Sequence, residues 1–145
     1  MSLRSWLSRV LDLIRLRRPA TSLGRRGEDA AARFLEAAGY RILERSLRYP
    51  CGELDLVALD GDTVVFIEVK TRTSTERGLP ADAVDKKKQA RTTLAALTYL
   101  KAKRMLDRRT RFDVVAVLWP AGAEQPEIKH YRAAFQAAAG NGMFS

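Results

Sequence analysis

The sequence contains little cysteine, little histidine and fewer acidic than basic residues. Its 145 residues include one cysteine and one histidine, and 26 Lys and Arg against 17 Asp and Glu give a net charge of +9. The single Cys51 excludes an internal disulfide, and the single His130 excludes a zinc site built from His and Cys side chains. The shortage of acids favours polyanionic partners, with nucleic acid first and an anionic membrane surface second.

Glycine-rich phosphate-binding loops and long apolar runs are also missing. The absence of a Walker-type or dinucleotide-type loop argues against a nucleotide-dependent enzyme. In the segment 1–20, three arginines and an aspartate interrupt the apolar residues, so neither a signal peptide nor a membrane span is predicted. At helical spacing this segment is a basic amphipathic helix, which can pack on the domain or a partner subunit, or contact nucleic acid or a membrane surface. We expect a cytoplasmic protein.

The composition that remains is typical of one globular domain, with 46% apolar and 30% charged residues. An Asp-Gly turn at Asp60-Gly61-Asp62 between two β-rich runs predicts a hairpin. The expected elements are a helix over 22–38, strands over 41–49, 52–59 and 63–71, a helix over 82–106, and strands over 111–119 and 128–131. This order predicts an α/β domain over 21–135, built on a single mixed β-sheet flanked by helices and followed by a tail over 136–145.

The hairpin carries the candidate site. Strand alternation places Asp55 on a face with Val57, places Leu54 and Leu56 on the opposite face, and allows Asp55 to approach Glu68 on the next strand. Two carboxylates so placed repel each other unless a positive charge lies between them. A divalent cation with oxygen ligands, Mg²⁺ or Mn²⁺, meets that requirement.

Two further charged residues can reach the same place. Lys70 interrupts an apolar strand on the same face as Glu68, where it can hold a phosphate oxygen or orient a water. Glu28 lies on the inward stripe of the helix over 22–38. The alternatives are a solvated hairpin end with Asp55 paired to Lys70, and a Glu28 that interacts only with the helix dipole.

Positive charge is concentrated beside this hairpin. Between Lys86 and Arg111 the chain has ten Lys and Arg and one acid, which suits contact with a phosphate backbone, although a solvated helix face is the alternative. Asp113 is interpreted as structural and paired with Arg111. The candidate nucleic-acid-binding residues are Arg25, Arg26, Arg72, Lys86, Lys87, Lys88 and Arg91.

Two sequence runs resemble a known family. The run G-E-L-D-L-V-A (52–58), followed by F-I-E-V-K-T-R (66–72), resembles the core of the PD-(D/E)XK nucleases, which include archaeal Holliday-junction resolvases. Over residues 22–135 the chain more closely resembles the bacterial YraN-type family. That pattern is matched in order by G-R-R-G-E (24–28), Gly39-Tyr40, the hairpin, Lys88-Gln89 and R-F-D-V (111–114).

The resemblance implies a restriction-endonuclease-like fold and a role for each matching residue. Asp55 and Glu68 would be metal ligands, with the Val69 carbonyl as a third and Glu28 completing the set. Lys70 would be the catalytic lysine. Gln89 would be an accessory polar residue near the phosphate, and Leu54 stands where the name motif has proline.

The leading hypothesis is a Mg²⁺- or Mn²⁺-dependent endonuclease that hydrolyses DNA phosphodiester bonds, with branched or single-stranded DNA as candidate substrates. A nucleic-acid-binding protein that keeps the nuclease fold without cutting is one alternative. A basic interaction module that docks on an acidic partner or membrane is another. Because junction-resolving relatives work as dimers, the resemblance also raises the expectation of a homodimer.

Overall fold

A computed structural model describes residues 23–74 and 85–137 of the chain. The predicted helix over 1–20 lies outside the described residues, as does the tail from residue 138 onward. The described elements are α2 (Leu23–Ala37), β1 (Arg41–Tyr49), β2 (Gly52–Asp60), β3 (Thr63–Arg72), α3 (Lys86–Ala102), β4 (Thr110–Leu118) and β5 (Glu127–Phe135).

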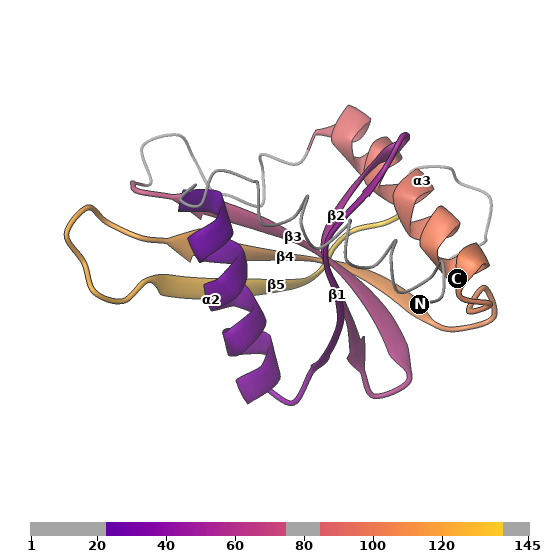
Figure 1. Cartoon of the computed structure of the whole chain (residues 1–145), viewed down its shortest axis with the longest axis horizontal. Helices are drawn as coiled ribbons and strands as arrows, with labels where there is room; N and C mark the ends of the chain where they lie inside the picture. The colour runs from indigo at the N-terminus through magenta and orange to yellow at the C-terminus, as the bar shows by residue number, and fades with distance from the viewer. Residues whose placement is uncertain (1–22, 75–84, 138–145) are drawn as a thin grey trace, which may run out of the picture.

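The five described strands form one sheet in the order β1-β2-β3-β4-β5. The β1–β2, β2–β3 and β4–β5 pairs are antiparallel, and β3 and β4 are parallel. A parallel pair requires a crossover between its strands, and here α3 lies within that crossover. The prediction of an α/β domain on a single mixed sheet is therefore confirmed (Figure 1).

The two helices cover opposite faces of the sheet because the buried strands are apolar on both sides. On β3, Val65 and Ile67 pack in one core with α2, whereas Val64 and Phe66 pack in a second core with α3. Figure 1 shows α2 and α3 well separated on a strongly twisted sheet. A strand buried on both faces reads as a continuous apolar run, so the polar residues that interrupt β3 require an explanation.

The predicted helix over 82–106 is too long at both ends. Asp85 has extended backbone angles, and its carboxylate accepts a hydrogen bond from the Lys88 N–H at 2.8 Å, so the helix begins at Lys86. The helix ends at Ala102, and two residues later Arg104 takes a left-handed conformation with φ of 56°. The last strand, in contrast, extends well beyond the predicted 128–131.

Two glycines allow the helices to lie close to the central strands. A Cβ at Gly27 of α2 would lie 1.8 Å from Thr71 Oγ1 on β3, and a Cβ at Gly52 of β2 would lie 2.6 Å from the Arg91 carbonyl oxygen on α3. A side chain at either position would therefore push a helix away from the sheet. Both contacts are next to the candidate site.

Candidate functional site

The site lies where β2 separates from β3. Their last paired residues are Leu56 and Ile67, and the next position in the same register would set Asp55 opposite Glu68. Beyond this point β2 remains paired with β1 alone. The Val69 N–H, which no longer faces the β2 backbone, donates to Asp55 Oδ2 at 2.9 Å. The Asp55 carboxylate thus bridges β2 and β3 where their backbone hydrogen bonds end, at the opened end of the β2–β3 ladder.

The alternation of β2 changes at Asp55. Leu56 packs in the core under α2, whereas Leu54, which strict alternation places on the same face, packs in the core under α3. The prediction for Leu54 is therefore wrong. On β1 the residue opposite Asp55 in this register is Ser46, which has a φ of 51°, a conformation rarely adopted by a residue with a side chain. The left-handed backbone of Ser46 on β1 thus lies at the position where β2 changes face.

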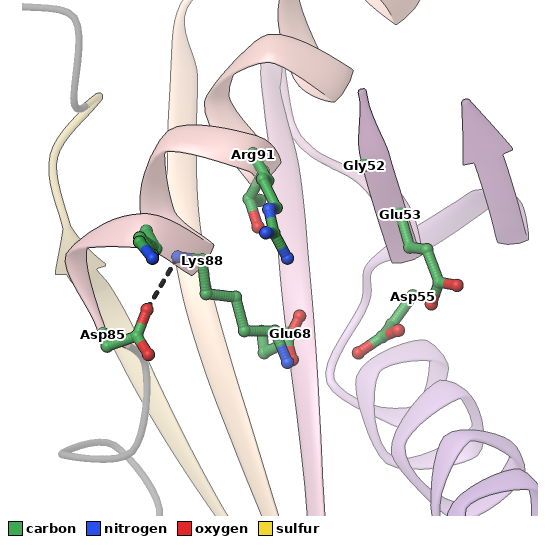
Figure 2. Close-up of a pocket in the computed structure, with 9 residues that line it drawn as sticks. Gly52, Glu53, Asp55, Glu68, Asp85, Lys88 and Arg91 are labelled. Carbon is green, nitrogen blue, oxygen red and sulfur yellow. Dashed lines mark hydrogen bonds and ion pairs between the residues drawn. The ribbon is translucent and has the colours of Figure 1, made fainter. Parts of the chain in front are cut away.

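Glu68 is a buried carboxylate with two lysine partners. Its side chain is 7% exposed, and its Oε1 atom pairs with Lys70 Nζ at 3.3 Å and with Lys88 Nζ from the first turn of α3. In Figure 2 the Lys88 side chain extends from α3 to Glu68, and the Asp55 carboxylate lies on the other side of the same space. Partial burial, followed by the neighbouring Lys88, lowers the pKa of Lys70.

The neighbouring acids of the site raise the pKa of Asp55. Burial, and after it the charge of Glu68, raises the pKa of Asp55 to about 8, although the hydrogen bond from Val69 lowers it. The Glu28 carboxylate of α2 also contributes to this increase, so it lies near Asp55. Glu28 itself accepts a hydrogen bond from Ser46 Oγ at 2.9 Å. A cation between these carboxylates would relieve their repulsion.

A pocket of about 470 Å³ opens over these residues. Asp55 and Glu68 line it from the strands, and Lys87, Lys88 and Arg91 line it from α3. The strands thus contribute acidic side chains to the pocket, whereas α3 contributes its basic side chains, with Asp85 at the start of the helix (Figure 2). An anion that enters from solvent would meet the α3 cations.

The structure brings together only some of the predicted site residues. Asp55, Glu68, Lys70 and Glu28 lie together; of these four, only Asp55 and Glu68 line the pocket, where Lys87, Lys88 and Arg91 join them. Among the described residues, those lining the pocket do not include Arg25, Arg26, Arg72, Lys86 or Gln89.

Two of these arginines, Arg26 and Arg72, have different surroundings. Arg26 lies with its guanidinium 4.1 Å from the centre of the Trp119 ring. Arg72 ends β3, and its buried Nε has no hydrogen-bond partner within the described part of the chain.

Sequence reasoning missed two features of the site. Ser46 gives no signal, because a serine in an alternating strand is unremarkable until its partner strand is known. The ion pair of Lys88 with Glu68 was missed because Lys88 was assigned to nucleic-acid contact with its neighbours. The acidic N-cap at Asp85, three residues earlier, was the available sign that Lys88 lies in the first helical turn.

Two carboxylates of this site suit a hard divalent cation. Within residues 23–74 and 85–137 no three His, Cys, Asp or Glu side chains are gathered to hold a metal ion, so Glu28 does not form a ready cage with Asp55 and Glu68. Mg²⁺ needs no such cage, because it keeps several waters and commonly uses one or two carboxylates. The half-buried Asp55 and the buried Glu68, which repel each other, fit that requirement.

The membrane criteria give a separate result. Neither described helix is long and apolar enough to cross a bilayer.

Comparison with known proteins identifies the family. Residues 27–117 match the family described as Uncharacterised protein family UPF0102. A UPF0102 protein of Rhodopirellula baltica is 50% identical over 118 residues, covering 79% of this chain and 71% of the relative. One from Geotalea daltonii is 49% identical over 117 residues, covering 81% of this chain and 91% of the relative. The match includes β2, β3 and α3, the elements that carry the site, and the chain belongs to the UPF0102 family, the YraN-type family that its motifs resemble.

Proposed function

We propose that this protein is a metal-dependent endonuclease with a restriction-endonuclease-like fold, which hydrolyses phosphodiester bonds in DNA. The observation that carries the proposal is a pair of carboxylates, half-buried Asp55 and buried Glu68, at the opened end of the β2–β3 ladder with Lys70 beside them. Like charges held close together are costly for a fold, and a pKa raised as far as that of Asp55 is typical of functional sites.

In this proposal Asp55 and Glu68 hold the cation, together with the Val69 carbonyl, and Glu28 supports the site through Asp55. When bound, Mg²⁺ or Mn²⁺ would polarise the scissile phosphate and lower the pKa of a water. Lys70 lies against Glu68 and is placed to stabilise negative charge on the phosphate or to orient the attacking water.

The basic side of the pocket supports a polyanionic substrate. Lys87, Lys88 and Arg91 project from α3 opposite the carboxylates, so a phosphate backbone can follow the helix while one phosphate approaches the site. Lys86 on the same turn is exposed and extends this charge. Arg25, Arg26, Arg72 and Gln89 are proposed as outer contacts to a longer substrate.

The test is a titration of Mg²⁺ and Mn²⁺ against labelled linear, single-stranded, flapped and four-way-junction DNA, with an RNA strand for comparison. We expect metal-dependent cutting that Glu68→Ala and Lys70→Ala each reduce by about 100- to 1,000-fold. Glu53→Gln is the matched control, because this exposed acid lines the same pocket and should leave cutting unchanged.

A second candidate is a nucleic-acid-binding protein that does not cut. The ion pair between Lys88 and Glu68 favours it, because a lysine there already neutralises a carboxylate that a metal would need. This candidate predicts binding that weakens steeply with salt and no product on any substrate with either metal. Such a result would replace the nuclease proposal.

A further inference from the structure

Glu68 has two cations on the same oxygen atom. Lys70 reaches Oε1 from the same strand, and Lys88 reaches it from the first turn of α3. A buried carboxylate needs a countercharge, and one lysine would supply it. The second lysine comes from a different element, so its pairing depends on how α3 packs against the sheet.

The position of Lys88 is set by its backbone. The Lys88 N–H donates to the Asp85 carboxylate that begins α3, and the close approach of Gly52 to the Arg91 carbonyl holds the first helical turns against β2. The side chain can still move, because it is 42% exposed and a lysine has four rotatable side-chain bonds. Its ammonium can therefore reach either Glu68 or an anion in the pocket.

A divalent cation and the Lys88 ammonium compete for Glu68. Both are positive, and both would be placed against a carboxylate that is only 7% exposed. A lysine paired with a carboxylate carries its positive charge at neutral pH, and Lys88 is paired in this way with Glu68. Metal entry therefore requires this charge to move away.

We infer that Lys88 is a displaceable countercharge: it occupies Glu68 until a nucleic-acid phosphate enters the pocket and draws its ammonium away, which frees the carboxylate for the metal. The inference rests on the proposed function. Phosphate binding and metal binding then strengthen each other by the same factor, since such coupling is reciprocal. The protein would bind metal weakly alone and more tightly with substrate in place.

The experiment measures Mn²⁺ binding by titration calorimetry on the full chain. The variants are Lys88→Gln, which removes the charge, Lys88→Arg, which keeps it, and Lys87→Gln as the matched control. Lys87 lines the same pocket, but among the described residues Glu68 forms its ion pairs with Lys70 and Lys88. Each titration is repeated with a nuclease-resistant phosphorothioate DNA oligonucleotide, after subtraction of Mn²⁺ binding to the DNA alone.

Without DNA we expect Lys88→Gln to bind Mn²⁺ about 10-fold tighter than the wild type, within the usual range of coupling between sites, and the other two variants to match the wild type. The oligonucleotide should tighten Mn²⁺ binding in the wild type by a similar factor and in Lys88→Gln much less. Tighter binding in Lys88→Gln supports the inference even if the wild type alone shows no detectable binding.

Failure of this inference is separable from failure of the proposed function. A wild type that binds Mn²⁺ and cuts DNA, with Lys88→Gln binding no tighter or with Lys87→Gln showing the same gain, overturns the countercharge role and leaves the nuclease. Absence of Mn²⁺ binding in the wild type and in Lys88→Gln, with and without DNA, overturns both.

Discussion

Two aspartates on the same sheet, the buried Asp113 and the half-buried Asp55, have opposite surroundings. Asp113 on β4 is fully buried and accepts hydrogen bonds from Arg111 at 2.8 and 3.0 Å and from the Ala133 N–H at 2.9 Å, with His130 Nε2 at 2.7 Å. Asp55 on β2 accepts from the Val69 N–H, and two other carboxylates lie near it.

The difference separates structure from function. A buried carboxylate with a full set of donors holds strands together, and Asp113 joins β4 to the edge strand β5 through His130 and the Ala133 backbone. Asp55 faces a pocket and like charges, an arrangement that costs stability. The fold maintains that cost at the position where a cation would remove it.

The largest expected effect is on stability at Asp113. Asp113→Ala would leave His130 and the Ala133 N–H without their acceptor and remove one partner of Arg111. We expect a loss of about 3–5 kcal/mol in the free energy of unfolding. Urea denaturation measures it, and Asp55→Asn is the comparison that should lose nothing or gain stability. Equal losses in the two variants would show that the two aspartates do not differ in this way.

The pH dependence of stability should be comparable in total, although it is spread over several pH units. The pKa of Asp55 is about 8 in the folded protein against 3.8 as the ordinary value, so between these values the folded state binds more protons than the unfolded one. Stability in metal-free buffer should therefore fall as pH rises from about 4 to about 8, by at most about 1.4 kcal/mol per pH unit, and level off above. Asp55→Asn should flatten this slope.

Asp60 should have the opposite dependence. Its hydrogen bond from Arg111 lowers the pKa of the Asp60 carboxyl, so its contribution is present above pH 4 and is lost as pH falls further. The Asp55→Asn variant should therefore still lose stability below pH 4, as measured by urea denaturation. If the slope of stability against pH between pH 4 and 8 were unchanged in Asp55→Asn, another titrating group would be responsible for it.

The packing of α3 provides a smaller effect. Gly52→Ala sets a Cβ against the Arg91 carbonyl, and we expect a cost of about 1–3 kcal/mol together with altered Mn²⁺ binding, because α3 carries Lys88. Gly122→Ala is the control: its Cβ has open space and its φ of 81° imposes only backbone strain, of about 1–2 kcal/mol. Titration with Mn²⁺ distinguishes the two variants, since only Gly52→Ala should alter the affinity for the metal.

The smallest effect is expected at Arg132, an exposed residue that pairs with Asp60, which in turn pairs with Arg111 beside Asp113. Arg132 pairs with Asp60 at 2.9 Å, but its side chain is 62% exposed and Asp60 retains Arg111. Arg132→Ala should cost no more than about 1 kcal/mol by urea denaturation. A loss as large as that of Asp113→Ala would mean that these paired residues act as one cooperative unit out to their exposed edge.

Local patterns predicted much of the fold. Alternation and the Asp-Gly turn predicted the bounds of β1 as observed, and those of β2 and β3 to within one residue. They could do so because a hairpin is specified by residues close together in the chain. The pairing of Asp113 with Arg111 was likewise predicted and is confirmed, since the two residues share a strand face.

Non-local features could not be predicted in the same way. His130 lies on β5, yet its side chain is only 12% exposed because it pairs with the buried Asp113 on β4. The change of face at Leu54 depends on the irregularity of β1 at Ser46. In both cases the residue responsible lies on a different strand from the residue that it affects.

The sequence by itself determined which charges this protein has and which elements carry them: acids on a hairpin, a lysine on the same strand and a basic helix. The tertiary structure decided which charges meet. Only the packing of α3 on the sheet places Lys88 on Glu68, and only the end of the β2–β3 ladder turns Asp55 toward the same pocket. The periodicity of a helix or strand determines the face on which a side chain lies. An ion pair between two elements also requires their faces to meet, and the packing of the helix on the strand decides whether they do.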